Sequence, residues 1–199
     1  MLFAFLIPVL ACDGKKEPLP YSPQEIIERQ KEMDTIYLAR LGDPAAMARF
    51  GLWRLRGAPV AADEDDGCRW SLKAALKGDV GAQFTTGRCY DKGWKETPPD
   101  PAEAMRWYLA AANGGNLQAA FEVATHYQQG RGVVVDAAEA FRWYSRLAEQ
   151  GHAGAQYLLG MMYANGEGTP VNRAEALRLL RLAAATGHAQ AIEAVARFE

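Results

Sequence analysis

The residues of this sequence that could do chemistry are few. Three serines, three histidines and three cysteines occur among its 199 residues. Hydrolases and phosphate-binding enzymes need such residues at fixed spacings, and the sequence holds no H-E-x-x-H, S-x-x-K, G-x-S-x-G or phosphate-binding loop. Ser22, Ser71 and Ser145 form no nucleophile–base pair, and His152 and His188 occupy one position of a repeat, as loop or cap residues do. We therefore predict no catalytic residue, no metal ligand and no cofactor.

Two of the cysteines, Cys68 and Cys89, lie ten residues before and eleven residues after Gly78. On antiparallel helices joined at that glycine, their thiols would lie at similar heights. A disulfide there would staple the first repeat of the chain to the second, by about 2–4 kcal/mol, in an oxidising compartment. The alternative is two small core residues, because equivalent positions hold Met105, Phe141, Leu177, His126 and Met162.

The third cysteine, Cys12, directly follows an apolar run of eleven residues. This run resembles a secretory signal, and Val9–Cys12 resembles a bacterial lipobox, in which the cysteine is lipidated. We expect residues 1–12 to be a signal and lipobox segment and the polar residues 13–22 to be a tether. Lipidation implies a periplasmic protein anchored to a membrane, with Asp13 favouring the inner membrane by resemblance to enterobacterial sorting. The alternative is a disordered or core-docked tail.

The composition gives no reason to expect a nucleic-acid partner. The formal net charge is −2, from 22 basic and 24 acidic residues, whereas nucleic-acid binding usually shows as a basic excess. No stretch approaches the ~20 apolar residues that span a bilayer. The length suffices for one domain with a sizeable core.

An internal repeat supplies the elements that position these residues. Glycines recur in steps of 36, 37, 36 and 36 residues, at Gly42, Gly78, Gly115, Gly151 and Gly187. Four residues after each lies an alanine: Ala46, Ala82, Ala119, Ala155 and Ala191. Fifteen residues after the first four lie Gly57, Gly93, Gly130 and Gly166. Twelve residues along lie Tyr90, Tyr127 and Tyr163, where the first repeat has Arg54.

Capping residues mark the start of a second helix in each repeat. Equivalent positions hold Asp63, Asp100, Asp136 and Asn172, whose side chains accept hydrogen bonds from first-turn amides. Three residues later come Asp66, Glu103, Glu139 and Glu175, and the last three are expected to complete capping-box pairs. The acidic run Asp63–Asp66 is therefore interpreted as a helix start, with a site for a basic partner or Ca²⁺ as the alternative.

These positions together resemble the Sel-one-like repeat family, a relative of the tetratricopeptide repeats. The matching residues include Tyr127, Gly130, Gly132, Asp136, Ala140, Trp143, Tyr144 and Gly151, then Leu159, Gly160, Tyr163, Gly166 and Gly168. The resemblance implies an all-α, right-handed α-solenoid of helix-turn-helix repeats over residues 42–199, with four full repeats and a closing half-repeat, Ala189–Phe198. A further helix over residues 23–41 is expected to cap the first repeat, in which Arg54 and Pro59 depart from the pattern.

A candidate binding surface follows from positions that vary between the repeats. First helices line the concave face of such a solenoid, and positions seven, ten and fourteen after each opening glycine share one helical stripe. The stripe comprises Arg49, Leu52, Arg56, Thr85, Arg88, Lys92, Glu122, Thr125, Gln129, Leu158, Met161 and Asn165. It is basic at one end and apolar at the other, which suits a protein partner; the alternative is an ordinary solvated face. Trp94 either packs on the ridge or is an exposed anchor of this surface.

The resemblance implies a non-catalytic protein–protein interaction module. Exported bacterial members of the family serve as adaptors, and some neutralise secreted antibacterial effectors, including type VI lipase effectors, as immunity proteins. We expect an envelope protein that binds a partner protein on its concave face, with immunity as the specific hypothesis. The alternative is a scaffold for envelope assembly or signalling. A cell-wall hydrolase or β-lactamase-like enzyme is a third hypothesis that no residue pattern supports.

Overall fold

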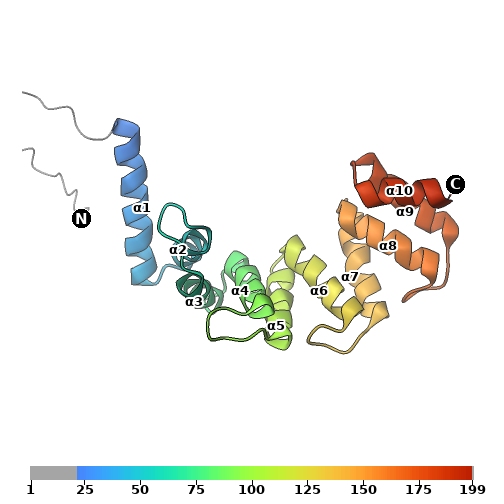
Figure 1. The fold of residues 1–199 in the computed structure, drawn as a ribbon, viewed down its shortest axis with the longest axis horizontal. Coiled ribbons are helices and arrows are strands. Elements are labelled where there is room, and N and C mark those ends of the chain that lie inside the picture. The colour runs from blue at the N-terminus through green and yellow to red at the C-terminus, as the bar shows by residue number, and fades with distance from the viewer. Residues whose placement is uncertain (1–21, 199) are drawn as a thin grey trace, which may run out of the picture.

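The computed structural model describes residues 22–198, and this part of the chain is helical (Figure 1). Its helices are α1 Pro23–Leu41, α2 Pro44–Arg56, α3 Glu64–Ala75, α4 Val80–Lys92, α5 Pro101–Asn113, α6 Leu117–Gln129, α7 Ala137–Glu149, α8 Ala153–Asn165, α9 Arg173–Ala185 and α10 Ala189–Phe198. Within that range the β pairing is an isolated bridge between Trp94 and Thr97. The predicted all-α class is confirmed.

The predicted signal and lipobox segment, with Cys12, and nearly all of the predicted tether lie outside the described residues. Lipidation and the membrane anchor therefore stay predictions. No helix of the described part is long and apolar enough to cross a membrane.

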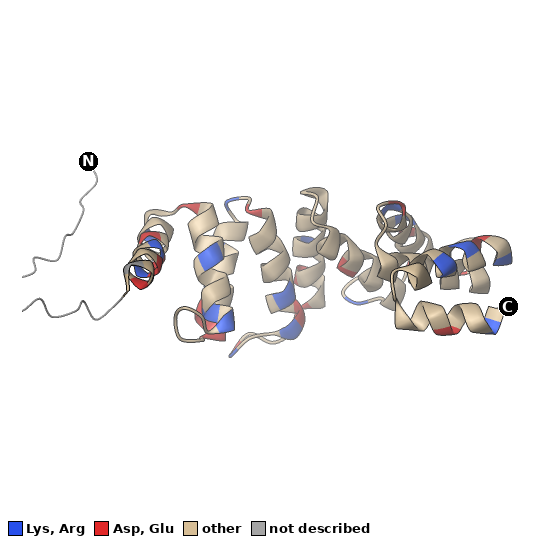
Figure 2. Cartoon of the chain, turned by 90° about the horizontal axis from the view of Figure 1, so that it is seen from above, with Lys and Arg blue, Asp and Glu red and all other residues tan. Residues whose placement is uncertain are grey.

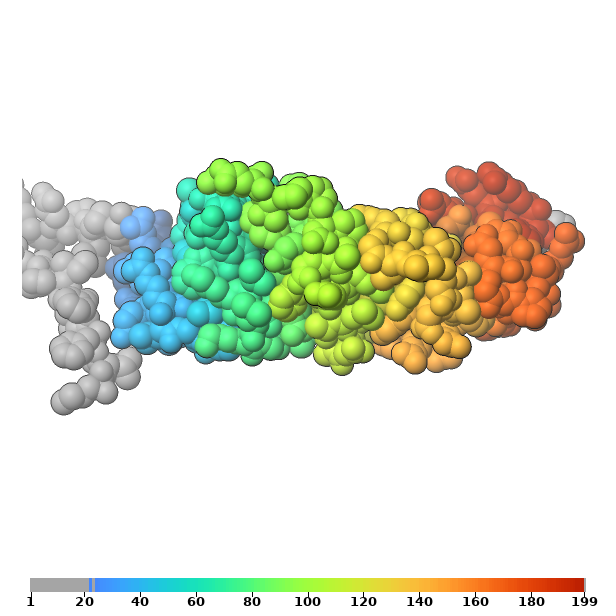
Figure 3. Space-filling view, turned by 90° about the horizontal axis from the view of Figure 1, so that it is seen from below, coloured from blue at the N-terminus to red at the C-terminus, as the bar shows by residue number. Residues whose placement is uncertain are grey.

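Each helix packs chiefly against the helices that precede and follow it in the sequence. Figure 1 shows the row as a bow, with α4 and α5 in its middle lower than α1 and α10 at its ends. In the space-filling view the repeats follow one another in colour order from the N-terminal to the C-terminal end (Figure 3). Contacts between sequence neighbours alone are typical of a solenoid. Four helix pairs, α2–α3 to α8–α9, form the repeats, and α10 closes the row.

The recurring small residues form the core, as the repeat predicts. The five alanines that follow the opening glycines, Ala46, Ala82, Ala119, Ala155 and Ala191, are all buried. Each lies in the first turn of its helix, and three of them pack against the preceding second helix, as Ala82 does against Ala74 and Ala75 of α3. Helices separated by such small side chains can approach closely, which is how successive repeats stack.

Each repeat also fits a side chain of its second helix against a small residue of its first helix. Tyr108 of α5 is buried against Gly87 of α4, where an added Cβ would lie 2.6 Å from the tyrosine ring. In the first repeat, Ser71 takes the place of the tyrosine, and a Cβ on Gly51 would lie 2.8 Å from its Oγ. The glycine therefore sets how closely the two helices of a repeat approach.

Side-chain caps begin the helices where the sequence predicts them. Asp63, Asp100, Asp136 and Asn172 each accept a hydrogen bond from an amide in the first turn of a second helix. The first helices are capped in the same way by Asp43, Asp79, Asn116 and His152. His152 is thus a capping residue, in agreement with its place in the repeat.

The predicted capping boxes at Glu103, Glu139 and Glu175 are only half formed. Their amides donate to the N-cap side chains, but their carboxylates pair with Arg106, Arg142 and Arg178, three residues further on. The N-cap amides already have an acceptor, because Asp63, Asp100, Asp136 and Asn172 donate to the carbonyls of Arg54, Tyr90, Tyr127 and Tyr163 at 2.8, 2.7, 2.9 and 2.8 Å. We call these four bonds the loop-closing bonds. Because they already use the N-cap amides, no N-cap amide is left to donate to a glutamate carboxylate.

Candidate protein-binding groove

First helices of the first three repeats line a groove with a volume of about 690 Å³. Its walls come from α2, α4 and α6, and α3 and α5 add side chains between them. The groove is defined by Leu52, Leu55, Arg56, Glu64, Cys68, Thr85, Arg88, Cys89, Asp91, Lys92, Tyr108, Glu122 and Arg131.

Half of the predicted stripe lies in this groove. The six stripe residues that line it are Leu52, Arg56, Thr85, Arg88, Lys92 and Glu122. They come from three successive repeats, so stacking brings together side chains that are up to 70 residues apart, from Leu52 to Glu122. This is the part of the stripe that the sequence predicts to be basic.

The other stripe residues lie outside the groove: Arg49, Thr125, Gln129, Leu158, Met161 and Asn165. Three of them are engaged within the molecule, and one of these is Asn165, whose side-chain amide donates to the carboxylate of Glu167 at 2.9 Å. The hydroxyl of Thr125 donates to the carbonyl of Phe121 and lies 3.1 Å from the hydroxyl of Tyr144, and Leu158 packs against the core of the third and fourth repeats. A partner-binding role for these six residues stays a prediction.

A second hollow of about 360 Å³ continues the groove toward α8. The two hollows share Arg88 and Glu122, and the second also reaches Phe84, Phe121 and His152. The rings of Phe121 and His152 are stacked with their centroids 5.1 Å apart, so this end of the surface is aromatic. The joined hollows run from α2 to the N-cap of α8.

Ion pairs occupy part of the charge in the groove. The ammonium of Lys92 lies 2.5 Å from a carboxylate oxygen of Glu64, and the guanidinium of Arg131 lies 2.6 Å from Asp91. Arg56 and Arg88 form no ion pair with another described residue, and the same holds for Glu122. The groove therefore presents two arginines and one carboxylate to a ligand.

Tyr108 stands between these charges. Burial raises the pKa of its hydroxyl, Asp91 and Glu122 raise it further, and Arg88 and Arg131 lower it. A tyrosine with a raised pKa keeps its proton at neutral pH. Tyr108 therefore acts as a neutral ring with a hydrogen-bonding hydroxyl, without the reactivity of a phenolate.

A buried histidine supports the wall formed by Asp91 and Arg131. Nδ1 of His126 lies 2.8 Å from the carbonyl oxygen of Arg131, and its Nε2 lies 3.7 Å from Asp91. The imidazole also meets the ring of Tyr108 edge-on at 5.4 Å. His126 thus lies beside both partners of the Asp91–Arg131 ion pair and bonds to the main chain of one of them, where the second repeat meets the third.

Cys68 of α3 and Cys89 of α4 are joined by a disulfide in the structure, with their Cα atoms 6.0 Å apart. The bond connects the second helix of the first repeat to the first helix of the second repeat. Both cysteines line the groove, so the disulfide forms part of its floor. The alternative of two separate core thiols does not describe this structure.

The interpretation of Trp94 as an exposed anchor is wrong. Trp94 is only 8% exposed and clusters with Cys68 and Cys89. Trp94 and Thr97 exchange two backbone hydrogen bonds, of 2.9 and 2.7 Å, which fold the loop back on itself. Its ring therefore packs against the disulfide and meets Tyr90 edge-on at 4.9 Å. Trp94 supports the groove from behind and leaves the surface to other residues.

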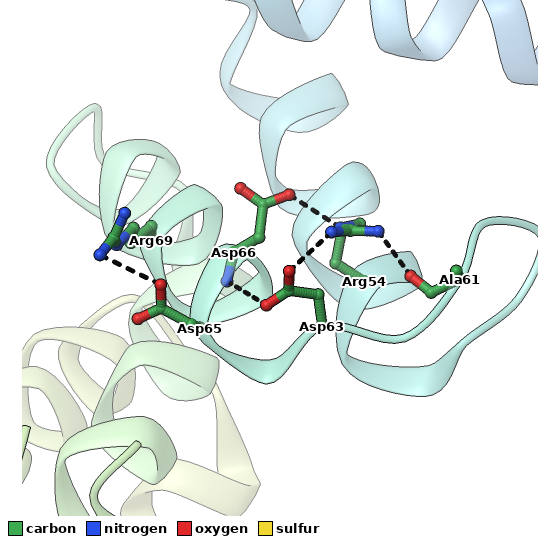
Figure 4. Close-up of polar contacts among 6 residues, drawn as sticks. All are labelled: Arg54, Ala61, Asp63, Asp65, Asp66 and Arg69. Atoms are coloured by element: carbon green, nitrogen blue, oxygen red, sulfur yellow. Dashed lines mark hydrogen bonds and ion pairs between the residues drawn. The ribbon is translucent and has the colours of Figure 1, made fainter. Parts of the chain in front are cut away.

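The acidic run Asp63–Asp66 begins a helix (Figure 4). Asp63 accepts from the amide of Asp66, and the guanidinium of Arg54 contacts both carboxylates at 2.9 and 2.8 Å. Arg54 also donates to the carbonyl of Ala61. Arg69 pairs with the remaining aspartate of the run at 3.0 Å. All of these carboxylates, including that of Glu64, are held by groups of the protein itself.

The departure of Arg54 from the repeat pattern now has a structural reason. Its carbonyl forms the same loop-closing bond as the tyrosines of the later repeats. Its guanidinium adds the contacts to the acidic run that a tyrosine could not make. The sequence holds the signal for this exchange, because an arginine replaces the aromatic residue only where the following helix begins with three acidic residues.

Charges of both signs are interspersed along the row (Figure 2). This mixture of signs along the ribbon agrees with the net charge of −2. Within residues 22–198, no three His, Cys, Asp or Glu side chains are arranged to hold a metal ion.

The sequence interpretation missed five groove residues: Leu55, Glu64, Asp91, Tyr108 and Arg131. Leu55 and Asp91 occupy position thirteen of their repeats, beside the predicted stripe, so a wider stripe would have included them. Arg131 lies in the loop after α6, where helical spacing carries no information. The sequence does place a histidine, His126, at a core position. A buried imidazole needs a hydrogen-bonding partner, and this requirement points to a polar group close to His126.

The chain belongs to the Sel1 repeat family, since the family model matches residues 44–79, 80–116, 117–152 and 153–188. Four repeats cover most of the chain, as the sequence predicts, and α10 adds the half-repeat. Sel1 repeat proteins are generally protein–protein interaction modules.

Similar solved structures include a Sel1 repeat protein from Oxalobacter formigenes, 29% identical with a TM-score of 0.72, over 79% of this chain and 64% of that one. Another is c5321, a protective antigen of uropathogenic Escherichia coli with an SLR fold, 30% identical with a TM-score of 0.75, over 80% and 34%. The chitin synthase regulator SKT5 of Saccharomyces cerevisiae is 38% identical over 80 residues, 39% of this chain and 11% of that protein. The chain thus spans only part of each of these relatives.

Proposed function

We propose that this protein is a non-catalytic binding module whose protein partner occupies the groove. The proposal rests on the location of the residues that differ between the repeats. Six of the twelve stripe residues, which change character between repeats, converge in the groove, whereas the alanines that the repeats share are buried between helices. A repeat protein that varies one surface over a constant core is organised for recognition.

The chemistry of the groove supports binding over catalysis. Cys68 and Cys89 are bonded to each other and offer no thiolate. The neutral hydroxyl of Tyr108 is the wrong form for a nucleophile. Asp91 is tied to Arg131 and Glu64 to Lys92 in ion pairs, and the histidine next to Asp91, His126, is fully buried.

Site-specific photo-crosslinking tests this proposal. A photoreactive benzoylphenylalanine would replace Arg88, which lines both hollows, and in a control it would replace Arg106, whose side chain is 80% exposed on α5. We expect a defined crosslinked protein from position 88 that excess unlabelled protein competes away, and none from position 106. Identical crosslinks from both positions, or none from position 88, would remove the basis of the proposal.

A finer role is proposed on the strength of the N-terminal segment and the family. The lipobox-like Val9–Cys12 supports an exported, membrane-anchored protein, and a tethered solenoid suits an immunity protein that meets a secreted effector and blocks it. Cells that express the protein would then survive a co-encoded effector, and cells with a charge-reversed Arg88→Glu variant would not. Survival that does not depend on the protein would eliminate the immunity role and favour a scaffold.

A further inference from the structure

The charge in the groove is unevenly distributed. On the side of α2 and α4, Arg56 and Arg88 are exposed and form no ion pair with another described residue. On the side of α6, Glu122 lines the groove and forms no ion pair with any residue of the described range 22–198. The remaining charges, on Glu64, Lys92, Asp91 and Arg131, cancel within their own ion pairs. One end of the groove therefore attracts a carboxylate and the other end repels it.

Apolar side chains form part of the floor next to the two arginines. Leu52 and Leu55 lie on the α2 side, and the Cys68–Cys89 disulfide lies between α3 and α4. The disulfide is supported from behind by Trp94, so this part of the floor is held in place before any ligand arrives. A preformed apolar floor beside unpaired guanidinium groups suits a ligand that carries both an apolar side chain and a carboxylate.

The length of the surface indicates a chain segment as the ligand. The groove and the second hollow share Arg88 and Glu122 and together reach from Leu52 on α2 to His152 before α8. A small molecule would fill one hollow, whereas an extended peptide crosses both. A nucleic acid is disfavoured because the same surface holds carboxylates among its lining residues, and the chain has a net charge of −2.

We propose that the groove recognises an acidic protein segment, whose carboxylate binds Arg56 and Arg88 while a neighbouring aliphatic or aromatic side chain packs on Leu52, Leu55 and the disulfide. This inference rests on the proposed function, because it specifies the partner of the same groove. Arginine is suited to the role, since its planar guanidinium holds a carboxylate through two parallel hydrogen bonds. Glu122 confines the acidic residues of the segment to the end that lies over α2 and α4.

Selection from a peptide library tests the inference without knowledge of the natural partner. The probe is a displayed library of random peptides of about twelve residues, which extend over roughly 40 Å. The full protein selects from it in parallel with the charge reversal Arg56→Glu/Arg88→Glu. The matched control is Arg106→Glu/Arg142→Glu, which changes the net charge equally on exposed residues of α5 and α7 outside the groove.

We expect the wild-type protein and the control to enrich peptides in which Asp or Glu adjoins a large apolar residue. Anisotropy titration of a selected peptide should show affinity at least about tenfold weaker for the groove reversal and nearly unchanged for the control. The affinity should also fall as NaCl is raised from about 50 to about 300 mM. Enrichment of neutral or basic peptides, or equal affinity in both double variants, would overturn the inference.

A groove-filling variant separates this inference from the proposed function. Thr85→Trp, checked for folding by circular dichroism, obstructs the groove without changing its charge. Peptides that lose binding in Thr85→Trp but carry no acidic preference would sink the inference and leave the groove as a protein-binding site. Peptides that bind Thr85→Trp as well as the wild type would sink both. Displacement of the peptides by heparin or single-stranded DNA at equal concentrations would show a general polyanion site and also overturn the inference.

Discussion

At the scale of residues, single atoms decide how deep a side chain can lie. Tyr108 reaches the groove because α4 has no Cβ at Gly87. The same repeat position holds Gly51 and Gly160, each facing a residue of the paired second helix. The sequence shows that this position stays small, but it does not show which aromatic ring fills the space, because Trp107 and Tyr108 are adjacent.

Gly87→Ala should destabilise the protein. The new Cβ would lie 2.6 Å from the ring of Tyr108, and overpacking of this kind costs about 1–3 kcal/mol, more than the gain of up to about 1 kcal/mol from helix propensity. Urea unfolding followed by circular dichroism measures the change. Gly81→Ala is the matched control on the same helix, because the nearest atom to its Cβ is 3.4 Å away. Equal stability of the two variants would contradict the packing described for Gly87.

The ionisation of Asp63 should make stability depend on pH. The hydrogen bond from the Asp66 amide, and then Arg54, lower the pKa of Asp63 below 3.8 in the folded protein. A lowered folded-state pKa stabilises the protein above the unfolded pKa, and this contribution is lost as the pH falls through the folded value. Asp63→Asn keeps a capping side chain but cannot ionise, so it should be less stable than wild type at neutral pH.

The difference between wild type and Asp63→Asn should shrink as the pH falls below 3.8, the unfolded value. Urea unfolding of both proteins at about pH 7 and about pH 3 gives the two differences. NMR titration of the Asp63 carboxyl carbon measures the pKa directly. A difference that stays constant across this range would show that Asp63 contributes only as an uncharged cap.

At the scale of elements, periodicity and capping chemistry predict where the helices lie, but they do not predict the geometry of the loops. Asp63, Asp100, Asp136 and Asn172 begin their helices as predicted because an N-cap is a local interaction. The predicted role of the glutamate carboxylates in the capping boxes is wrong, because the N-cap amide donates instead to a main-chain carbonyl nine or ten residues earlier. The sequence does not decide whether Trp94 is buried, because its burial depends on the disulfide between α3 and α4.

Removal of the disulfide should weaken the contact between the first two repeats. Cys68 and Cys89 are 21 residues apart, and a loop of this length stabilises the folded state by about 3 kcal/mol when it is closed. Cys68→Ala/Cys89→Ala should therefore unfold at lower urea concentration than the wild type. Dithiothreitol should lower the midpoint of the wild type and leave that of the double variant unchanged. A wild type that is insensitive to the reductant would contradict the stapling role.

At the scale of the whole molecule, stability is distributed along the row. Each helix depends on its neighbours in sequence, so interior repeats have contacts on both sides and terminal helices on one. In α1, residues 24–31 are all exposed, and burial begins further along, at Thr35 and Ala39. The sequence predicts this capping helix but not that its first half extends beyond the repeat, because side-chain pattern alone does not report which turns have a neighbour.

Hydrogen exchange should follow this gradient. Amides in the first half of α1 should exchange fastest among the helices, and those of α5, α6 and α7 should exchange slowest, because local opening is easiest where few groups are buried. Mass spectrometry of peptic fragments measures the rates. Uniform protection along the row would mean that the chain opens as a single cooperative unit.

The loop-closing bonds have a consequence for how such a chain can grow. They join main-chain atoms only, so the twelfth residue of a unit is free to be arginine in one copy and tyrosine in another while the turn keeps its shape. A duplicated or transplanted unit of 36 residues brings its own turn closure with it and needs a compatible neighbour only across its helix faces. Repeats can therefore be added, in nature or by design, without fixing which side chains line the binding surface.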